Sequence, residues 1–385
     1  MIKVALVFGT RPEAIKLAPV YLELKKRKTV FQPLLWLTGQ HRQMLDQVMR
    51  VFDLHADRDF DLMKPGQTLT SLTHAVLEAT TSAFAEERPD CILVQGDTTT
   101  VFAASLAAYY AKIHVGHVEA GLRTPTKYSP FPEEMNRRLT TRLADLHFPP
   151  TQLARENLLR EGVSEDCIWV TGNTVIDALA IVSERVRRER PPLPAGLPPR
   201  IIDGDGRMVL ITGHRRESFG EGFETICQAI AVLGRRYPDC EFVYPVHLNP
   251  NVQEPVHRLL SHYPNIHLIK PVEYEPFVWL MNRSHLLLTD SGGIQEEAPH
   301  LGKPVLVMRE TTERPEGLDA GTAKLVGVNL DQIVNETARL LDDPAAYQAM
   351  SQAANPFGDG KSAQRIADIL ERQFRPGSRL HDPEC

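Results

Sequence analysis

Four polar residues stand just after segments that are typical of buried strands: Asp97, Glu119, His214 and Ser291. In open α/β sheets ligands bind beyond the carboxyl ends of the strands, so these positions are candidates for one site. Glu133 can join them from the loop and helix start that follow Glu119. A single Asp after a strand is usually a helix cap, and a Glu in a first helical turn is favoured by the helix dipole. Three carboxylates at one wall repel one another unless something cationic is bound or forms there. The pattern therefore favours a site that stabilises positive charge.

The segment DSGGIQEEAP at residues 290–299 follows an apolar run and indicates a strand that turns into a helix. Gly292 and Gly293 let the backbone approach a ligand without a Cβ in the way, and the helix amides that follow suit a phosphate. Glu297, about one turn into the helix, is placed to accept from two neighbouring hydroxyls, as a ribose presents. The alternative is an ordinary strand-to-helix turn in which Ser291 caps the helix.

Basic residues surround these positions, and each of them alone is usually a solvated surface charge. They stand near the ends of predicted strands: Arg11, Lys16, Arg215, Arg216, Arg309 and Arg314. Arginine matches phosphate geometry, so together they form a plausible clamp for a diphosphate. The net charge is −6, so an anionic ligand depends on such local charges. Arg215 and Arg216 should also lower the pKa of His214 and keep it neutral until a diphosphate binds.

Two series of alternating strands and helices position these residues. The first has strands predicted at residues 2–8, 31–38, 91–95, 113–118, 148 and 168–170, with helices at 14–26, 41–52, 99–110 and 133–143. The second has strands predicted at 208–212, 241–246, 266–269, 285–289, 304–308 and 324–326. This alternation predicts an α/β fold with two Rossmann-like, doubly wound parallel sheets that face an interdomain cleft. The first turn has no Walker lysine and no GxGxxG, which argues against a P-loop NTPase and a dinucleotide site.

A chain of 385 residues is too long for one ordinary core and suggests two domains. We expect an N-terminal domain at residues 1–172 that carries the carboxylates, and a C-terminal domain at 173–361 that binds the nucleotide. The proline-rich segment at 191–199 is typical of a surface connector close to the domain boundary. The polar tail at 376–385 is expected to be disordered.

Composition limits the remaining classes of protein. Hydrophobic residues make up 42% and charged residues 24% of the chain, as in soluble globular proteins. No apolar run approaches the ~20 residues of a membrane span, and no signal peptide precedes the first strand, so we expect a cytoplasmic protein. The five cysteines are scattered, metal-binding spacings are missing, and the negative charge gives no nucleic-acid footprint. We expect no disulfide, no metal, and no nucleic-acid or membrane partner.

The segment at 290–299 resembles the nucleotide-binding signature of the non-hydrolysing UDP-N-acetylglucosamine 2-epimerases, a bacterial family with the two-domain GT-B architecture. Further blocks resemble the family in matching order: GTRPE at 9–13, QGDTT at 95–99, HVEAGLRT at 117–124, PFPEEMNR at 130–137, GHRRE at 213–217 and TERPE at 312–316. Because these blocks span most of the chain, coincidence does not explain them.

The resemblance implies roles for residues of both domains. It places the diphosphate or the sugar at Arg11, Lys16, His214, Ser291, Gly292, Gly293 and Arg314, the ribose at Glu297, and the uracil at residues 275–277, which include Phe277. It also implies that the last helix, at 362–375, packs back on the first domain. We expect a homodimer that needs no cofactor and interconverts UDP-N-acetylglucosamine and UDP-N-acetylmannosamine.

Interconversion of these sugars inverts C2, whose proton is not next to a carbonyl and is barely acidic. Oxidation at a neighbouring carbon would help, but the chain has no nicotinamide fingerprint. The remaining route is loss of UDP from C1, which builds oxocarbenium character and gives a 2-acetamidoglucal. Re-addition of UDP, with a proton from the other face, inverts C2. We expect Asp97, Glu119 and Glu133 to bind the sugar, to transfer the C2 proton and to stabilise the cation. Which of them is the base and which is the acid stays open.

Three other functions remain open from the sequence. A GT-B glycosyltransferase would use the same nucleotide grip, but it needs an acceptor site and has less use for three carboxylates. A hydrolysing epimerase would let water capture the intermediate and would release free N-acetylmannosamine and UDP. A catalytically silent UDP-sugar sensor is disfavoured because all the carboxylates are present.

A second, regulatory substrate site is the last expectation. Some members of the family bind a second UDP-N-acetylglucosamine through a segment that corresponds here to Gln40, His41 and Gln43, and through an arginine before a Gln-Thr-Leu sequence. In this chain Gly66 precedes that sequence, so the arginine is missing. We therefore expect activation by substrate to be weak or differently built.

Overall fold

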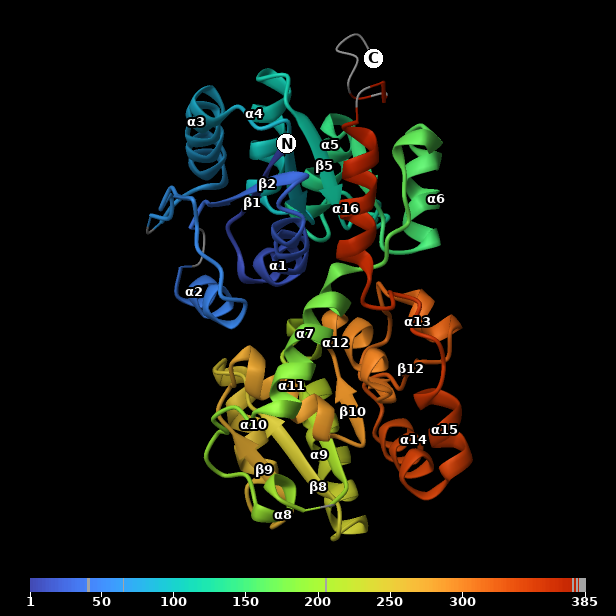
Figure 1. The fold of residues 1–385 in the computed structure, drawn as a ribbon. Coiled ribbons are helices and arrows are strands. Elements are labelled where there is room, and N and C mark those ends of the chain that lie inside the picture. The colour runs from blue at the N-terminus through green and yellow to red at the C-terminus, as the bar shows by residue number, and fades with distance from the viewer. Residues whose placement is uncertain (40–41, 65, 205, 376, 379, 381–385) are drawn as a thin grey trace. The chain divides into compact units, whose positions relative to one another are not determined.

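The computed structural model describes residues 1–39, 42–64, 66–204, 206–375, 377–378 and 380, with residues 42–44 and 216 described in their backbone only (Figure 1). The chain forms two compact units. Unit 1 comprises Met1–Ala178 and Phe357–Cys385, and unit 2 comprises Leu179–Pro356. Nearly all of the tail at 376–385 lies outside the described residues, so its predicted disorder stays a prediction.

Unit 1 is built on a six-stranded parallel sheet in the order β3-β2-β1-β4-β5-β6. Its strands are β1 (Ile2–Phe8), β2 (Phe31–Leu37), β3 (Arg58–Asp59), β4 (Cys91–Gln95), β5 (His114–Val118) and β6 (Leu146–Phe148). Its helices are α1 (Arg11–Lys26), α2 (Arg42–Val51), α3 (Leu69–Glu87), α4 (Thr99–Tyr110), α5 (Glu133–Leu143), α6 (Gln152–Arg160) and α16 (Ser362–Gln373), with a short 3-10 turn η1 (Glu165–Cys167). Every residue of β4 is buried, as expected for a parallel strand covered on both faces.

Two features of unit 1 differ from the sequence analysis. No element was predicted between residues 53 and 90, yet α3 occupies much of that segment. Its threonines lower intrinsic helix propensity, but Val76 and Phe84 are buried, and Phe84 packs 5.4 Å from the ring of Trp36. The strand predicted at 168–170 is wrong, because Ile168 forms only an isolated bridge to His147.

Unit 2 repeats the architecture with a sheet in the order β12-β11-β10-β7-β8-β9. Its strands are β7 (Met208–Thr212), β8 (Glu241–Pro245), β9 (Ile266–Ile269), β10 (Leu286–Thr289), β11 (Val305–Val307) and β12 (Ala323–Leu325). Its helices are α8 (Pro199–Ile202), α9 (Glu221–Arg236), α10 (Pro250–Leu260), α11 (Tyr274–Arg283), α12 (Gly292–Glu297), α13 (Pro315–Asp319), α14 (Leu330–Asp342) and α15 (Pro344–Ser351), with the 3-10 turns η2 (Arg216–Ser218) and η3 (Ala298–Leu301). All strand pairs in both sheets are parallel, which confirms the predicted α/β fold class.

Both sheets have the strand order of a Rossmann fold, in which the direction of winding reverses at one point. In unit 1 the reversal lies between β1 and β4, and in unit 2 it lies between β7 and β10. Ligands of such folds bind beyond the carboxyl ends of the strands at this point. The turns that follow these four strands are therefore where each unit offers a binding crevice.

The chain passes from unit 1 to unit 2 inside α7 (Thr174–Arg188), a few residues after the boundary suggested from the sequence. The proline-rich segment at 191–199 belongs to unit 2 and leads into α8, so it is not the connector between the units.

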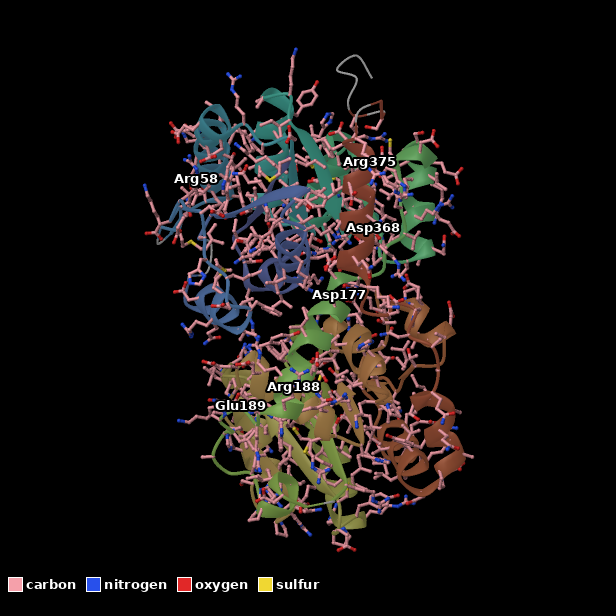
Figure 2. The ribbon with its side chains drawn as sticks, in the orientation of Figure 1. Arg58, Asp177, Arg188, Glu189, Asp368 and Arg375 are labelled. Carbon is pink, nitrogen blue, oxygen red and sulfur yellow. The ribbon has the colours of Figure 1, made fainter. Side chains whose placement is uncertain are left out.

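Helix α16 returns the end of the chain to unit 1, where it packs against α1 (Figure 1). The carboxylate of Asp177 accepts from the backbone amides of Ser362 at 3.2 Å and Ala363 at 2.8 Å, which caps this helix. Asp368, labelled with Asp177 in Figure 2, pairs with Arg27 at the end of α1 at 2.6 Å.

Candidate active site

The crevice of unit 1 is organised by Glu13, which the sequence analysis did not select. Thr10 and Glu13 form a capping box at the start of α1. The Glu13 carboxylate accepts from the backbone amides of Gly9 at 3.0 Å and Thr10 at 2.7 Å, and from the hydroxyl of Thr98 at 2.6 Å. Burial raises the pKa of Glu13, and these hydrogen bonds oppose the rise. Glu13 thus joins the turn after β1 to the turn after β4.

Glu119, the first residue after β5, is the most heavily partnered carboxylate of this crevice. Lys16 Nζ donates to both carboxylate oxygens of Glu119, at 2.7 and 2.6 Å, and only 16% and 9% of the two side chains is exposed. Asn173 Nδ2 donates at 3.0 Å, and the amide of Gln95 donates as well. A cation and two amides all favour the ionised carboxylate. Glu119 also has a φ of +61°, a left-handed backbone conformation that is uncommon outside glycine and is often found at functional sites.

Asp97, in the turn after β4, is paired with a second cation, the buried Arg137. Arg137 Nη2 lies 2.9 Å from Asp97 Oδ2, and Arg137 is 5% exposed. Burial is the largest influence and raises the pKa of Asp97, and the negative charges of Glu119 and Glu133 raise it further, while Arg137 and Lys16 oppose the rise. The structure therefore places the three predicted carboxylates close enough to influence one another's charge.

Glu133, the first residue of α5, carries a buried oxygen, Oε2, that has no hydrogen-bond partner among the described residues. Two donor groups of Arg137, Nε and Nη1, are buried in the same unsatisfied state. A buried polar atom without a partner is costly, so such atoms call for an explanation in a folded protein. A bound ligand that offers hydroxyl or amide groups is one physical explanation.

The crevice of unit 2 is organised by Asp290, which directly follows β10 and is fully buried. Asp290 Oδ2 accepts from the backbone amides of His214 at 2.6 Å and Arg215 at 2.7 Å, which joins the turns after β10 and β7. His214 Nδ1 lies 3.4 Å from Asp290 Oδ1. The ring of His214 stacks on that of His247, with centroids 5.5 Å apart and an interplanar angle of 18°.

The pKa of His214 is lowered, which confirms the predicted direction. The cause differs from the prediction, which named only neighbouring arginines. Burial contributes most, His247 and Arg215 lower the pKa further, and Asp290 opposes them. His214 is therefore neutral near pH 7 in the unliganded protein.

The glycine pair after β10 leaves room beneath two arginines. A Cβ built on Gly292 would lie 3.9 Å from the guanidinium carbon of Arg314 and 4.0 Å from Nη2 of Arg215. Glu296 accepts from Arg314 Nε and fixes that side chain. Ser291 is the N-cap residue of α12, but its side chain makes no capping hydrogen bond. The segment brings two guanidinium groups to a stretch of backbone that lacks side chains.

The remaining predicted residues take different places. A Cβ on Gly293 would lie 3.4 Å from Glu297 Oε1, so Glu297 stays beside the glycine pair. Phe277 is half-buried in the first turn of α11. Arg11 is the first residue of α1, and Arg309, which was also predicted in the phosphate clamp, pairs with Glu217 at 2.6 Å.

Lys16 was expected to contact the diphosphate or the sugar, and in the structure it pairs with Glu119, so its contact with a ligand stays a prediction. Gln40 and His41 lie outside the described residues, as does the side chain of Gln43, so the regulatory expectation stays a prediction. Within the described ranges no group of three or more potential metal ligands occurs, and no helix is long and apolar enough to span a membrane.

Comparison with known proteins identifies the family. Residues 23–371 match the family described as UDP-N-acetylglucosamine 2-epimerase. Over 372 residues, 96% of this chain and 98% of the relative, the sequence is 57% identical to UDP-N-acetylglucosamine 2-epimerase of Escherichia coli strain K12. The chain belongs to the UDP-N-acetylglucosamine 2-epimerase family.

Other members of the family agree in length and fold. The enzyme of that name from Yersinia pestis is 57% identical over 371 residues, which cover 96% of this chain and 98% of the relative. The crystal structure of UDP-GlcNAc 2-epimerase from Neisseria meningitidis bound to UDP-GlcNAc superposes with a TM-score of 0.84 at 50% identity. That likeness covers 96% of this chain and 99% of the other.

Several residues of this family member were missed by sequence reasoning. Glu13 could have been found, because Thr10-x-x-Glu13 is a capping-box sequence. Arg137 and Asp290 lie inside blocks that carried the resemblance. Their spacing in the sequence does not predict the ion pair of Arg137 with Asp97 or the two backbone amides that donate to Asp290. His247 follows β8 without any motif, and only the folded chain brings its ring to His214.

Proposed function

We propose that this protein catalyses the reversible C2 epimerisation of UDP-N-acetylglucosamine to UDP-N-acetylmannosamine without hydrolysis. The observation that carries the proposal is the group of three carboxylates, Asp97, Glu119 and Glu133, held with the cations Lys16 and Arg137 in one crevice of unit 1. The names of the relatives and the UDP-GlcNAc bound to the Neisseria meningitidis protein support this choice of substrate.

The reaction begins when the C1–O bond breaks and UDP leaves with the bonding electrons. Positive charge grows at C1 and the ring oxygen, which makes the C2 proton removable and gives a 2-acetamidoglucal. Glu119 is fixed by Lys16 and two amides, so it suits stabilisation of this charge in its ionised form. Asp97 and Glu133 are then left for proton transfer at C2, one on each face of the sugar.

Return of UDP to C1 and of a proton to C2 completes the cycle with all atoms accounted for. Addition of the proton to the face opposite the one it left gives the other epimer. The raised pKa of Asp97 brings this group nearer to the pH at which a carboxyl can both accept and donate a proton.

In this proposal unit 2 holds UDP. Arg215 and Arg314 meet the diphosphate over the bare backbone at Gly292, because guanidinium groups bind phosphate oxygens in pairs. His214 is neutral before binding and gains a proton when the diphosphate brings negative charge, which helps neutralise the leaving oxygen. Glu297 takes the ribose hydroxyls, and Phe277 lies against the uracil.

Purified protein with UDP-N-acetylglucosamine in deuterated water, followed by proton NMR, tests this function. We expect UDP-N-acetylmannosamine with deuterium at C2, and deuterium in the recovered substrate at equilibrium. Free N-acetylmannosamine with UDP would instead indicate a hydrolysing epimerase. No reaction until a sugar acceptor is added would indicate a glycosyltransferase. Asp97→Asn is the control that should abolish incorporation.

We also propose that the enzyme is a homodimer that works in the cytoplasm and supplies precursors for cell-surface polysaccharide. Tyr109 and Tyr110 at the end of α4 are 61% and 65% exposed and offer surface that a second copy would bury. Light scattering after size exclusion should give twice the 43.2 kDa of one chain. A mass of one chain at assay concentrations would contradict the dimer.

A further inference from the structure

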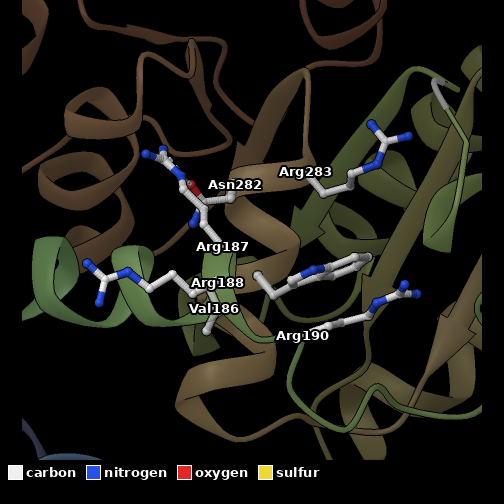
Figure 3. A pocket seen from close by; sticks show the side chains of 7 residues that line it. Val186, Arg187, Arg188, Arg190, Asn282 and Arg283 are labelled. Atoms are coloured by element: carbon white, nitrogen blue, oxygen red, sulfur yellow. Dashed lines mark hydrogen bonds between the residues drawn. The ribbon is translucent and has the colours of Figure 1, made fainter.

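A cavity in unit 2 lies outside the site described above. Its volume is about 590 Å³, within the range of small-molecule sites. Figure 3 shows this basic pocket, which is lined by Val186, Arg187, Arg188, Arg190, Trp279, Asn282 and Arg283. The lining comes from the end of α7, the chain just after it, and the second half of α11.

The basic pocket lies at the opposite edge of the unit 2 sheet from Asp290. Arg283 ends α11 shortly before β10 begins, and Asp290 follows the last residue of the same strand. A four-residue strand spans about 13 Å, which separates the two ends. A ligand in the basic pocket would therefore be a different molecule from the proposed UDP-sugar.

The positive charge of this pocket is only partly neutralised. Arg190 pairs with Asp203 at 2.8 Å, and Arg188 pairs with Glu184. In contrast, Arg187 donates only to the amide oxygen of Asn282, at 3.1 and 2.9 Å, a contact visible in Figure 3.

Arg283 likewise donates only to backbone carbonyls, those of Ile201 at 3.0 Å, Arg200 at 3.5 Å and Gly204. Among the described residues neither Arg187 nor Arg283 has a carboxylate within 4 Å.

Helix dipoles account for basic residues in the last turns of α7 and α11. They do not account for two arginines, Arg187 and Arg283, that line one pocket without a described acidic partner, an arrangement that a bound anion would relieve. Lys303, just before β11, does not line the pocket, but burial and then the charges of the same two arginines lower its pKa, as expected near a basic region.

We propose that the basic pocket binds a nucleoside phosphate, with its phosphates on Arg187 and Arg283 and its base against Trp279. Guanidinium groups bind phosphate through paired hydrogen bonds. Trp279 is half-buried in the wall of the pocket, so its indole is a surface on which a base stacks. The inference does not depend on the epimerase reaction.

Intrinsic fluorescence offers a direct test, because the other tryptophans, Trp36 and Trp169, belong to unit 1. Titration of the full-length protein with ADP should give a saturable change that is lost in Trp279→Phe. Calorimetry should show that Trp279→Phe still binds ADP, because phenylalanine keeps a stacking surface, whereas Trp279→Ala binds more weakly. Pyrophosphate, which lacks a base, should bind more weakly than ADP.

Charge-reversal variants locate the phosphates. Arg187→Glu and Arg283→Glu should each weaken ADP binding by about tenfold or more. Arg235→Glu is the matched control, because Arg235 is an exposed arginine in the last turn of another helix, α9. Arg187→Glu should also leave epimerase turnover and KM unchanged, which shows that the fold is intact.

Three results would overturn the proposal. One is the absence of a saturable change at millimolar ADP. The second is an equal loss of binding in Arg235→Glu, which would indicate attraction by overall charge. The third is equal affinity for pyrophosphate and ADP, which would remove the base from the site.

Discussion

Replacement of Lys16 by methionine tests whether the central ion pair of unit 1 holds Glu119. The change keeps the length of the side chain and removes the charge that lies 2.6 Å from the carboxylate. Removal of one partner from a buried pair typically costs about 3–5 kcal/mol, because a charge is left without compensation, whereas an exposed pair contributes about 0–1 kcal/mol. The Lys16–Glu119 pair is partly buried, and Asn173 and Gln95 still donate to Glu119, so we expect a loss of unfolding free energy between these values, about 2 kcal/mol.

Urea unfolding of four proteins measures this cost: the parent, Lys16→Met, Glu119→Gln and the double variant. The double variant should be more stable than Lys16→Met, because no unpaired charge remains. Lys26→Met is the matched control. Lys26 lies on the same helix and pairs with Glu23, but the Lys26 side chain is 75% exposed. Such exposed pairs contribute about 0–1 kcal/mol. If Lys16→Met cost no more than Lys26→Met, the pair would not hold Glu119 in solution and the assigned role of Glu119 would fail.

Four further predictions use the same structure. Asp97→Asn and Glu133→Gln should each lower turnover by about two to four orders of magnitude with little change in UDP affinity, and either one that kept normal turnover would be structural only. Burial holds the pKa of Glu13 above its ordinary value of 4.5, so the contribution of Glu13 to stability is fully present below pH 4.5 and is lost as pH rises through the folded-state pKa. Urea midpoints should accordingly show the parent losing stability relative to Glu13→Gln as pH rises above 4.5. Binding of UDP should move the NMR titration of His214 to higher pH, and an unshifted titration would leave the arginines as the phosphate partners. Because Gly66 replaces the arginine implied by the family resemblance, the reverse reaction from UDP-N-acetylmannosamine alone should proceed without a lag, and strong stimulation by UDP-N-acetylglucosamine would contradict this.

The positions of the site residues could be predicted because buried parallel strands can be recognised in the sequence. A buried parallel strand is a continuous apolar run, and the residue after it stands at the carboxyl edge of the sheet. Asp97 and Glu119 were placed by that rule alone, and the folded chain puts both where their charges interact. The short β3 and the threonine-rich α3 were missed because neither has this pattern.

The partners of the site residues could not be predicted, because pairing depends on side-chain direction and on residues distant in sequence. Lys16 was assigned to a phosphate from its place near the first turn, yet its ammonium group reaches a carboxylate 103 residues away. Asn173 reaches the same carboxylate from the start of α7. Spacing along the chain carries no information about such contacts.

The charges of the unit 1 crevice explain why these pairings matter for the proposed chemistry. Asp97 pairs with Arg137 and Glu119 pairs with Lys16. In the proposed mechanism the carboxylates interact more strongly with an oxocarbenium ion than with a neutral sugar, so they lower the barrier to loss of UDP rather than tightening ground-state binding. Without the two cations the carboxylates would repel one another and take up protons, and their negative charge would be lost. Lys16 and Arg137 would therefore preserve the charge on which the proposed chemistry depends.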